Sequence, residues 1–375
     1  MKIVIVGGHL SPALGVIDAL SENDTVVFIG RKYALEGDKA TSLEYGEITQ
    51  RNIPFKSLTT ARIQRKVTSK TFPSLAKLPI GLYQAVTYLR EVNPDVVLSF
   101  GGYLSLPVGY AAKMLGIPLV IHEQTLQAGF ANKILGKIAD KVCISWETST
   151  QFFPKNKVVI TGNPLKEFKI DDFPFIFKKS DISLPLIYIT GGSTGSHAIN
   201  ELVEDSLSEL LAKYRIIHQT GDSKQFKDYD RLCKKRDELP SELQSRYFVE
   251  KFILSTSVGG VFKEASMVVS RSGINTVSEL MYFGKPALLI PLPHGQRDEQ
   301  ATNARFLQNI GLGLILPQET ATPAIFQKSI EQVVKNKDEY LLHVKEARQI
   351  LHPRAAHEII HVLSYVVNKK SSQKR

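Results

Sequence analysis

The sequence is poor in cysteine. Its 375 residues hold two cysteines, Cys143 and Cys233, which lie far apart in the chain. That number and spacing exclude a disulfide framework and a cysteine-based metal site, and they are consistent with a reducing cytoplasm. Long apolar runs are missing too, because none approaches the roughly 20 residues that a membrane-spanning helix needs. The N-terminal MKIVIVGG carries no cleavage signature, so we expect no signal peptide.

Two common nucleotide-binding signatures are also absent. The first glycine turn, GGH at residues 7–9, is not the GxGxxG of dinucleotide-binding folds. The turn GGSTGSHAIN at residues 191–200 is not the GxxxxGK[ST] of P-loop ATPases. Both enzyme classes are therefore disfavoured.

Acidic residues are outnumbered: 37 Asp and Glu stand against 47 Lys and Arg, a formal net charge of +10. Such a protein suits nucleic acid, an anionic membrane or a phosphorylated substrate. No recognised nucleic-acid-binding module appears, so we expect no nucleic-acid partner. In the segment 56–90, basic residues flank apolar ones, a pattern typical of an anionic membrane surface. A solvated basic face over core residues explains that segment equally well.

What is present is an alternation of apolar strands and amphipathic helices. Several strands end in glycine turns, among them KIVIVGG, PDVVLSFGG, LPLIYITGG and MVVSRSG. Continuous apolar strands separated by helices predict an α/β protein with parallel sheets covered on both faces.

The alternation pauses near residues 162–164, and the polar segment 166–181 reads as a linker. We therefore expect two Rossmann-like domains, at residues 1–164 and 165–345. A C-terminal segment, 346–375, is predicted to be helical until about Val367 and to end in a basic tail.

The candidate ligand sites lie at the carboxyl ends of the strands, where open parallel sheets bind ligands. In SRSGINTVSEL (270–280), Ser272 and Gly273 open a helix whose partial positive charge can hold a diphosphate. Glu279 is placed to accept both hydroxyls of a ribose. Plain turns and capped helices remain the structural alternative. His122 and Glu123 are adjacent but have no third partner at ligand spacing, so we expect no metal site.

Taken together, the motifs resemble the MurG family of glycosyltransferases, which complete lipid II in peptidoglycan synthesis. The similar segments occur in the family's order: FGGYLSLP, HEQ, AGFANKILGKIADKV, TGNPL, GGSTGSHAINELV, HQTG and SRSGINTVSELMYFGKPALLIPLPH. The resemblance covers nearly the whole chain. It implies a GT-B fold, in which two Rossmann-like domains face each other across a cleft and a C-terminal helix packs back on the first domain.

The resemblance also implies a reaction. The donor is UDP-N-acetylglucosamine (UDP-GlcNAc), and the acceptor is undecaprenyl-diphospho-MurNAc-pentapeptide (lipid I) at the cytoplasmic face of the membrane. Transfer inverts the anomeric carbon and needs neither a metal nor another cofactor. We therefore expect a peripheral membrane enzyme.

The site residues follow from the same resemblance. On the donor side they are Lys166, Ser193, Phe252, Ile253, Ser272, Gly273, Glu279, Glu299 and Gln300. On the acceptor side they are Gly7, Gly8, Tyr103, His122, Thr125 and Asn132. We expect His9 to be the general base, because a neutral imidazole suits that role near pH 7, with Glu123 as the alternative.

Three segments depart from the family's pattern. The first loop is GGH where the family has GGTGGH, Thr125 follows HEQ where the family has Asn, and Lys166 follows GNPL where the family has Arg. These departures leave other functions open: transfer to a different lipid such as diacylglycerol, a UDP-GlcNAc 2-epimerase, or a catalytically silent nucleotide-sugar binder.

Overall fold

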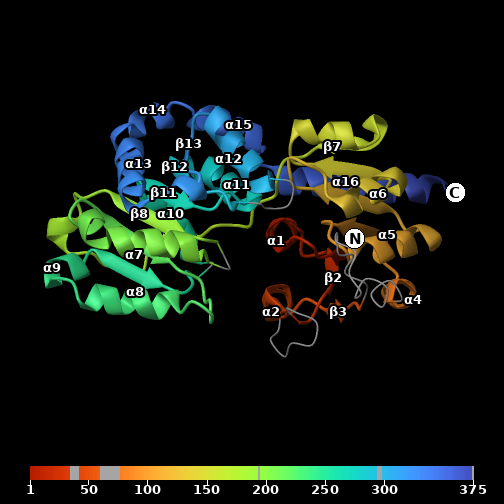
Figure 1. The fold of residues 1–375 in the computed structure, drawn as a ribbon. Coiled ribbons are helices and arrows are strands. Elements are labelled where there is room, and N and C mark those ends of the chain that lie inside the picture. The colour runs from red at the N-terminus through yellow and green to blue at the C-terminus, as the bar shows by residue number, and fades with distance from the viewer. Residues whose placement is uncertain (34–41, 60–76, 193–194, 255, 294–297, 374–375) are drawn as a thin grey trace. The chain divides into compact units, whose positions relative to one another are not determined.

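The computed structural model describes residues 1–33, 42–59, 77–192, 195–254, 256–293 and 298–373. The chain divides into two compact units (Figure 1). Unit 1 comprises Met1–Lys166 and His352–Arg375, and unit 2 comprises Glu167–Leu351.

Unit 1 is built on a seven-stranded parallel sheet with the order β3-β2-β1-β4-β5-β6-β7. Its strands are β1 (Lys2–Val6), β2 (Thr25–Gly30), β3 (Phe55–Ser57), β4 (Val96–Ser99), β5 (Leu119–Glu123), β6 (Lys141–Ile144) and β7 (Val158–Ile160). Its helices are α1 (Leu10–Asp18), α2 (Leu43–Gln50), α4 (Lys77–Val92), α5 (Ser105–Met114), α6 (Phe130–Ile138) and α16 (Ala355–Gln373).

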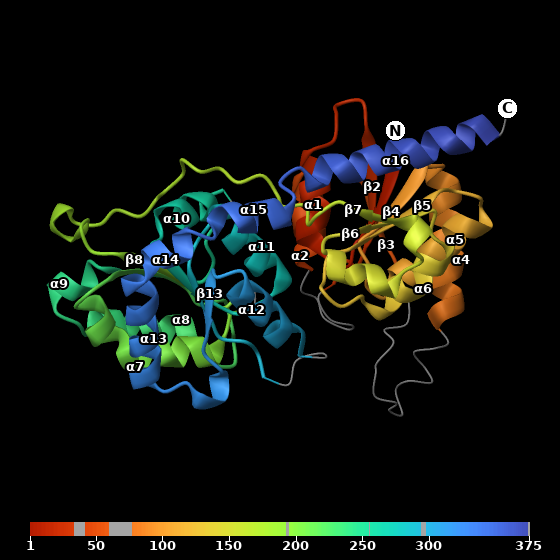
Figure 2. The same cartoon turned by 90° about the horizontal axis from the view of Figure 1, so that it is seen from above.

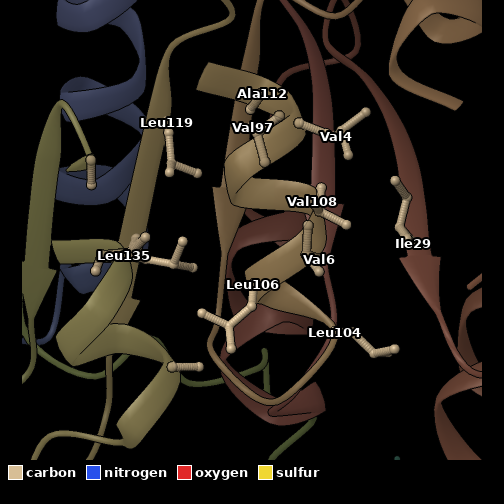
Figure 3. Packing of buried hydrophobic residues seen from close by; sticks show 14 of the residues in the cluster. Val4, Val6, Ile29, Val97, Leu104, Leu106, Val108, Ala112, Leu119 and Leu135 are labelled. Atoms are coloured by element: carbon tan, nitrogen blue, oxygen red, sulfur yellow. The ribbon is translucent and has the colours of Figure 1, made fainter. Parts of the chain in front are cut away.

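The core of unit 1 lies on both faces of this sheet. Along β1, Val4 and Val6 point to the cluster under α4, α5 and α6, which Figure 3 shows from close by. The alternate residues Ile3 and Ile5 point to the other cluster, formed with α1 and α16. This alternation is the period of a strand, and residues apolar at every position produce a strand buried on both faces.

The C-terminal helix belongs to unit 1, because α16 packs against α1, β4 and β6 (Figure 2). Its side chains Ile359 and Leu363 are completely buried in the cluster with β1. The helix runs to Gln373, so the prediction that it ends near Val367 was wrong. Basic residues near the end did not stop it, since Lys is a good helix former and complements the negative end of the helix dipole.

Unit 2 is built on a six-stranded parallel sheet with the order β10-β9-β8-β11-β12-β13. Its strands are β8 (Leu186–Thr190), β9 (Arg215–Gln219), β10 (Tyr247–Glu250), β11 (Met267–Ser270), β12 (Ala287–Leu289) and β13 (Gly313–Ile315). Its helices are α7 (His197–Leu211), α8 (Asp228–Asp237), α9 (Ser241–Gln244), α10 (Val258–Glu264), α11 (Ile274–Phe283), α12 (Glu299–Asn309), α13 (Pro323–Lys335), α14 (Lys337–Leu341) and α15 (Val344–Leu351).

The segment predicted as a linker, residues 166–181, packs on unit 2. Phe168 and Phe177 are each 8% exposed. The segment lies so close to α10 that a Cβ on Gly260 would stand 2.1 Å from the carbonyl oxygen of Asp172. The aromatic residues of this polar stretch therefore anchor it, and only its first residues connect the two units.

Both sheets have their first strand in the middle, β1 between β2 and β4 and β8 between β9 and β11. At these positions successive crossovers leave in opposite directions, and the loops at the carboxyl ends of the strands diverge to leave room for a ligand. The predicted fold class of two Rossmann-like units with parallel sheets is confirmed. No helix in the described ranges is long and apolar enough to cross a membrane.

Candidate active site

The first glycine loop of unit 1 touches the loop that follows β4. A Cβ on Gly8 would stand 2.1 Å from the carbonyl oxygen of Gly101, and one on Gly102 would stand 3.0 Å from the Cα of Gly8. Gly101 and Gly102 also have φ of +80° and +79°, a region that side chains disfavour. The structure thus brings Gly7 and Gly8 beside the loop that carries half-buried Tyr103. The two loops are neighbours because they follow the adjacent strands β1 and β4.

His9 lies at the entrance of α1. It is the N-cap residue, with extended backbone (φ −134°, ψ 106°), but its side chain makes no capping hydrogen bond and is exposed. Although the residue as a whole is exposed, desolvation by surrounding protein lowers the pKa of His9, and the carboxylate of Glu123 opposes this in part. The imidazole is therefore neutral at pH 7 and has the lone pair that a general base needs.

Glu123, at the end of β5, is 2% exposed and accepts four hydrogen bonds. Its Oε1 accepts from the backbone N–H of Thr125 (3.0 Å) and from the Thr125 hydroxyl (2.6 Å). Its Oε2 accepts from the Gly129 N–H (2.8 Å) and from Nδ2 of Asn132 (3.0 Å). The carboxylate thus fastens residues 124–129 to the start of α6.

His122 and Asn132 are buried beside it and each keeps an acceptor without a hydrogen-bond partner. Nε2 of His122 lies 3.1 Å from the carbonyl oxygen of Gly162 and 3.2 Å from the Ser145 hydroxyl. Burial lowers the pKa of His122 to about 4, so the ring is neutral. Within the described part of the chain, Nδ1 of His122 and Oδ1 of Asn132 have no partner. Buried orphan acceptors of this kind call for a bound water or ligand.

In unit 2 the loop after β8 is held by Gln219, the last residue of β9. Its Nε2 donates to the carbonyl oxygen of Gly192 (3.1 Å), and its Oε1 accepts from the N–H of Ile253 (3.0 Å). Ile253 is thereby fixed near the glycine loop, next to Phe252, whose side chain is 52% exposed. Ser193, the predicted donor residue of this loop, lies outside the described residues. Gln219 lies in the segment HQTG, which resembles that of the MurG family, but no role was assigned to it from the sequence, because its contacts are with residues remote in the chain.

Behind Gln219 lies a buried network that sequence reasoning also missed. Asn200 on α7 is fully buried, and its Nδ2 donates to the carbonyl oxygen of Thr220 (3.1 Å) and to Asp228 (2.8 Å). Its Oδ1 lies 3.0 Å from Nε2 of His218, whose Nδ1 lies 2.8 Å from the Tyr247 hydroxyl. Burial lowers the pKa of His218 to about 3, so this histidine is neutral. The network fixes the strand end that carries Gln219.

The loop after β11 is joined to α12 through Ser272. The buried Ser272 hydroxyl donates to the backbone oxygen of Gln300 (2.7 Å), and Nδ2 of Asn303 donates to the backbone oxygen of Ser272 (3.0 Å). Oε1 of Gln300 accepts from the Leu292 N–H (2.9 Å). Two predicted donor residues, Ser272 and Gln300, are thus brought into direct contact.

Gly273 is the N-cap residue of α11, and a Cβ built on it would meet nothing within 4 Å. The first-turn N–H groups of a helix have no partner within the helix, so this end can bind an anion. Preceding it, Arg271 donates to the backbone oxygen of Ile290 (3.0 Å) and to Oε1 of Gln318 (2.7 Å). Burial lowers the pKa of Arg271 to about 10, so it is still a cation at pH 7 and adds positive charge here.

The remaining predicted donor residues lie on different elements. Glu279, half-buried on α11, interacts electrostatically with the buried Tyr188 hydroxyl of β8. Glu299 is half-buried at the first position of α12. Lys166 ends the first stretch of unit 1, Met1–Lys166, and is therefore not part of the unit that carries the other donor residues. No three His, Cys, Asp or Glu side chains among the described residues are grouped as a metal site.

The chain was compared with known proteins. The sequence profile of the glycosyltransferase family 28 N-terminal domain matches residues 6–144, and that of the C-terminal domain matches residues 186–359. A relative from Flavobacterium psychrophilum is 32% identical over 98% of this chain and 96% of its own length. That relative is named UDP-N-acetylglucosamine–N-acetylmuramyl-(pentapeptide) pyrophosphoryl-undecaprenol N-acetylglucosamine transferase.

Solved structures give the same fold. The crystal structure of Acinetobacter baumannii MurG has a TM-score of 0.72 and 28% identity, with 97% of this chain and 100% of that chain covered. A UDP-GlcNAc 2-epimerase from Neisseria meningitidis, solved with UDP-GlcNAc bound, has a TM-score of 0.65 but only 13% identity. It covers 97% of this chain and 100% of its own, and it shares the fold alone. The chain belongs to glycosyltransferase family 28, and within it to the MurG family.

Proposed function

We propose that this protein transfers N-acetylglucosamine from UDP-GlcNAc to lipid I and so forms lipid II for peptidoglycan. The observation that carries the proposal is the match to both family 28 domains together with 32% identity to a named transferase over nearly the full length. We further propose that the transfer inverts the anomeric carbon and needs no metal ion.

For the donor, we propose that the start of α11 holds the diphosphate. The first-turn N–H groups after Gly273 and the positive end of the helix dipole stabilise negative charge there, and the Arg271 cation supports them. We assign Ser193 and Ser272 to the diphosphate as well; the buried Ser272 hydroxyl donates to the backbone oxygen of Gln300, so its part is to hold the start of α12 beside this loop. Glu279, one and a half turns into α11, accepts the hydroxyls of the ribose.

At the two ends of the donor, Phe252 and Ile253 border the uracil. The exposed ring of Phe252 offers an apolar face, while Gln219 holds the backbone of Ile253 in place. Glu299 and Gln300 at the start of α12 bind the GlcNAc. Oε1 of Gln300 already accepts from Leu292, so its Nε2 is the group that faces the sugar.

For the acceptor, we propose that His9 is the general base. Its neutral ring takes the proton from the attacking hydroxyl of MurNAc, the oxygen of that hydroxyl bonds to the anomeric carbon, and the bond from that carbon to the UDP oxygen breaks. UDP then leaves with its charge stabilised at α11. Lys166, next to the GNP turn, is the remaining cation proposed for the donor phosphates.

Glu123 then serves as a positioning residue. All its acceptor positions are used by four hydrogen bonds within the loop of residues 124–129 and α6. It therefore sets the places of Thr125 and Asn132, which we assign with His122, Tyr103 and the Gly7–Gly8 turn to the acceptor side.

We also propose that the enzyme works at the cytoplasmic face of the membrane as a peripheral protein, through the segment 56–90. In the described part of that segment, α4 exposes Ile80 (51%) and Tyr83 (74%) to solvent, and large exposed apolar side chains suit an interfacial contact. Residues 60–76 lie outside the described ranges.

The test uses two variants and two readouts. We expect Glu279→Ala to weaken UDP-GlcNAc binding, measured by calorimetry, because the ribose hydroxyls lose their acceptor. We expect His9→Ala to keep donor binding and to slow transfer to a lipid I analogue. An unchanged donor affinity in Glu279→Ala would contradict the donor assignment. Transfer to diacylglycerol but not to the lipid I analogue would favour the alternative acceptor suggested by the short GGH loop.

A further inference from the structure

A cavity of about 480 Å³ lies in unit 1 at the N-terminal ends of β5 and β6. The glycine loops lie at the opposite, carboxyl ends of the strands. It opens between the C-terminal ends of α5 and α16, which Figure 2 shows at the same end of the unit. Its polar lining consists mainly of Lys113, Asp140, Lys141, Tyr365, Lys369 and Lys370. The proposed transfer reaction uses none of these residues.

The lining is strongly basic. Four lysines stand against one aspartate, which leaves a formal charge of +3 among the described residues that line the cavity. The aspartate, Asp140, is already engaged: both its oxygens lie 3.1 Å from Nζ of Lys113, and Oδ2 accepts from the Leu119 N–H at 2.7 Å. Four ammonium groups around one engaged carboxylate favour an anionic ligand.

Helix dipoles explain only part of this charge. Lys113 and Lys370 lie in the last turns of α5 and α16, where cations are favoured at any helix end. Lys141, however, is the first residue of β6, and its Nζ lies 5.7 Å from the centre of the Tyr365 ring. Basic residues from three separate elements, α5, β6 and α16, thus line one cavity. The preference of lysine for helix ends does not explain this arrangement, because Lys141 lies on a strand.

Two exposed side chains with apolar bodies occur here: Tyr365, which lines the cavity, and Met114, which follows the lining residue Lys113 in the chain. Next to Lys113, Met114 is 68% exposed, and Tyr365 on α16 is 53% exposed. An aromatic side chain with a polar tip and a long apolar side chain suit the boundary between lipid headgroups and acyl chains. A basic cavity that is lined by an exposed tyrosine and has an exposed methionine next to it in the chain fits a ligand that carries a phosphate on an apolar body.

We propose that the cavity between α5 and α16 binds the phosphate headgroup of an anionic membrane lipid. The site is distinct from the glycine loops, and it is a second membrane contact beside the segment 56–90. It does not take part in the transfer reaction, so a water-soluble acceptor analogue should react at the normal rate when the site is removed.

The test measures binding of the full-length protein to two kinds of vesicle, phosphatidylcholine alone and phosphatidylcholine mixed with phosphatidylglycerol. The variant Lys141→Gln/Lys369→Gln/Lys370→Gln should bind the anionic vesicles about 100-fold more weakly, since each lysine contributes about 1 kcal/mol and tenfold corresponds to about 1.4 kcal/mol. Binding to phosphatidylcholine alone should not change.

The matched control removes three lysines from exposed positions of unit 2. Lys178→Gln/Lys179→Gln/Lys234→Gln changes the net charge equally but should keep most of the affinity. An equal loss in both triple variants would overturn the proposal, because net charge alone would then explain binding. Saturation by inorganic phosphate without binding to anionic vesicles would overturn it too, since the site would then take a free ion.

A fluorescent variant tests the place of contact without removing charge. Tyr365→Trp puts an indole in the lining of the cavity, and the single native tryptophan, Trp146, is 3% exposed and gives a constant background. Emission should shift to shorter wavelength with anionic vesicles. Vesicle binding without that shift would contradict the proposal, because the lipid would then contact another surface. Transfer to the water-soluble analogue serves as the control for folding and for the proposed activity.

Discussion

Gly273 and Gly284 stand at the two ends of α11, and a methyl group added at each should have opposite effects. Gly273 is the N-cap, with φ −62° and ψ 143°, and a Cβ there meets nothing within 4 Å. Alanine adopts that conformation without strain. Alanine is less favourable than glycine at the N-cap, which lowers the free energy of unfolding by a few tenths of a kcal/mol up to about 1 kcal/mol. Alanine also reduces the conformational entropy of the unfolded chain, which raises the free energy of unfolding by about 0.4–1 kcal/mol. The free energy of unfolding should therefore change by less than about 0.7 kcal/mol.

The donor affinity of Gly273→Ala should nevertheless fall. The added methyl group projects into the space where we place the diphosphate, so the phosphate oxygens must retreat from the N–H groups of the first turn. A hydrogen bond to a charged group contributes about 1.5–3 kcal/mol. Loss of one such bond raises the Kd for UDP-GlcNAc about 10- to 100-fold.

Gly284→Ala is the matched control at the other end of the helix. Gly284 has φ +64°, and its Cβ would stand 2.5 Å from Cγ1 of Val344. The left-handed backbone costs roughly 1–2 kcal/mol for alanine and the clash roughly 1–3 kcal/mol more. We therefore expect this variant to lose about 2–5 kcal/mol of stability and to keep its donor affinity under conditions in which it is folded.

Urea unfolding and calorimetric titration with UDP-GlcNAc separate the two effects. An unchanged Kd in Gly273→Ala would refute the assignment of the diphosphate to the start of α11. The assignment would also be refuted if Gly273→Ala lost donor binding only to the extent that it lost stability.

Three further predictions concern stability. Glu123→Gln should cost about 2–4 kcal/mol by urea unfolding, because an amide cannot accept all four bonds and leaves at least one buried donor unpaired; unchanged stability with abolished transfer would instead make Glu123 the base. In the folded protein His122 stays neutral down to about pH 4 and His218 down to about pH 3. In the unfolded chain both histidines take up a proton below the ordinary histidine pKa of about 6.5, so acid favours the unfolded chain. Stability should fall between pH 7 and pH 5 by about 2 kcal/mol for each histidine, and the drop should shrink when either is replaced by Gln. Gly8→Ala should destabilise the protein by about 1–3 kcal/mol, because the added methyl group would clash with the loop at Gly101. Gly46→Ala should stabilise it by about 0.5–1 kcal/mol, because Gly46 lies inside α2 and a Cβ there meets nothing within 4 Å. Melting curves that show Gly8→Ala to be the more stable variant would contradict this packing.

The two sheets were predictable because each central strand carries its own local signal. An apolar run such as Lys2–Val6 or Met267–Ser270 ends directly in a glycine turn, and both turns lie at a switch point of the observed topology. The strands Phe55–Ser57, Val158–Ile160 and Gly313–Ile315 have three residues each, which is too short to display a period. Their pairing with longer neighbours, rather than their own sequence, makes them strands.

The site was predictable where it depends on neighbours in sequence and obscure where it depends on distant pairs. The start of α11 follows from Ser272 and Gly273 alone. By contrast, Gln219 acts on Gly192 and on Ile253, which are 27 and 34 residues away, and Asn200 acts on residues 18 to 28 positions away. Glu123 looked like a candidate base because the sequence shows a carboxylate at a strand end but not the four donors around it.

The measurement that tests the central claim most directly is the release of UDP from UDP-GlcNAc, with and without a lipid I analogue, in the presence of EDTA. We predict that UDP is released only when the analogue is present, that EDTA does not reduce the rate, and that the product carries a β-linked GlcNAc. Donor binding without acceptor-dependent release would contradict the proposed transfer to lipid I, and release that EDTA abolishes would contradict the metal-independent mechanism.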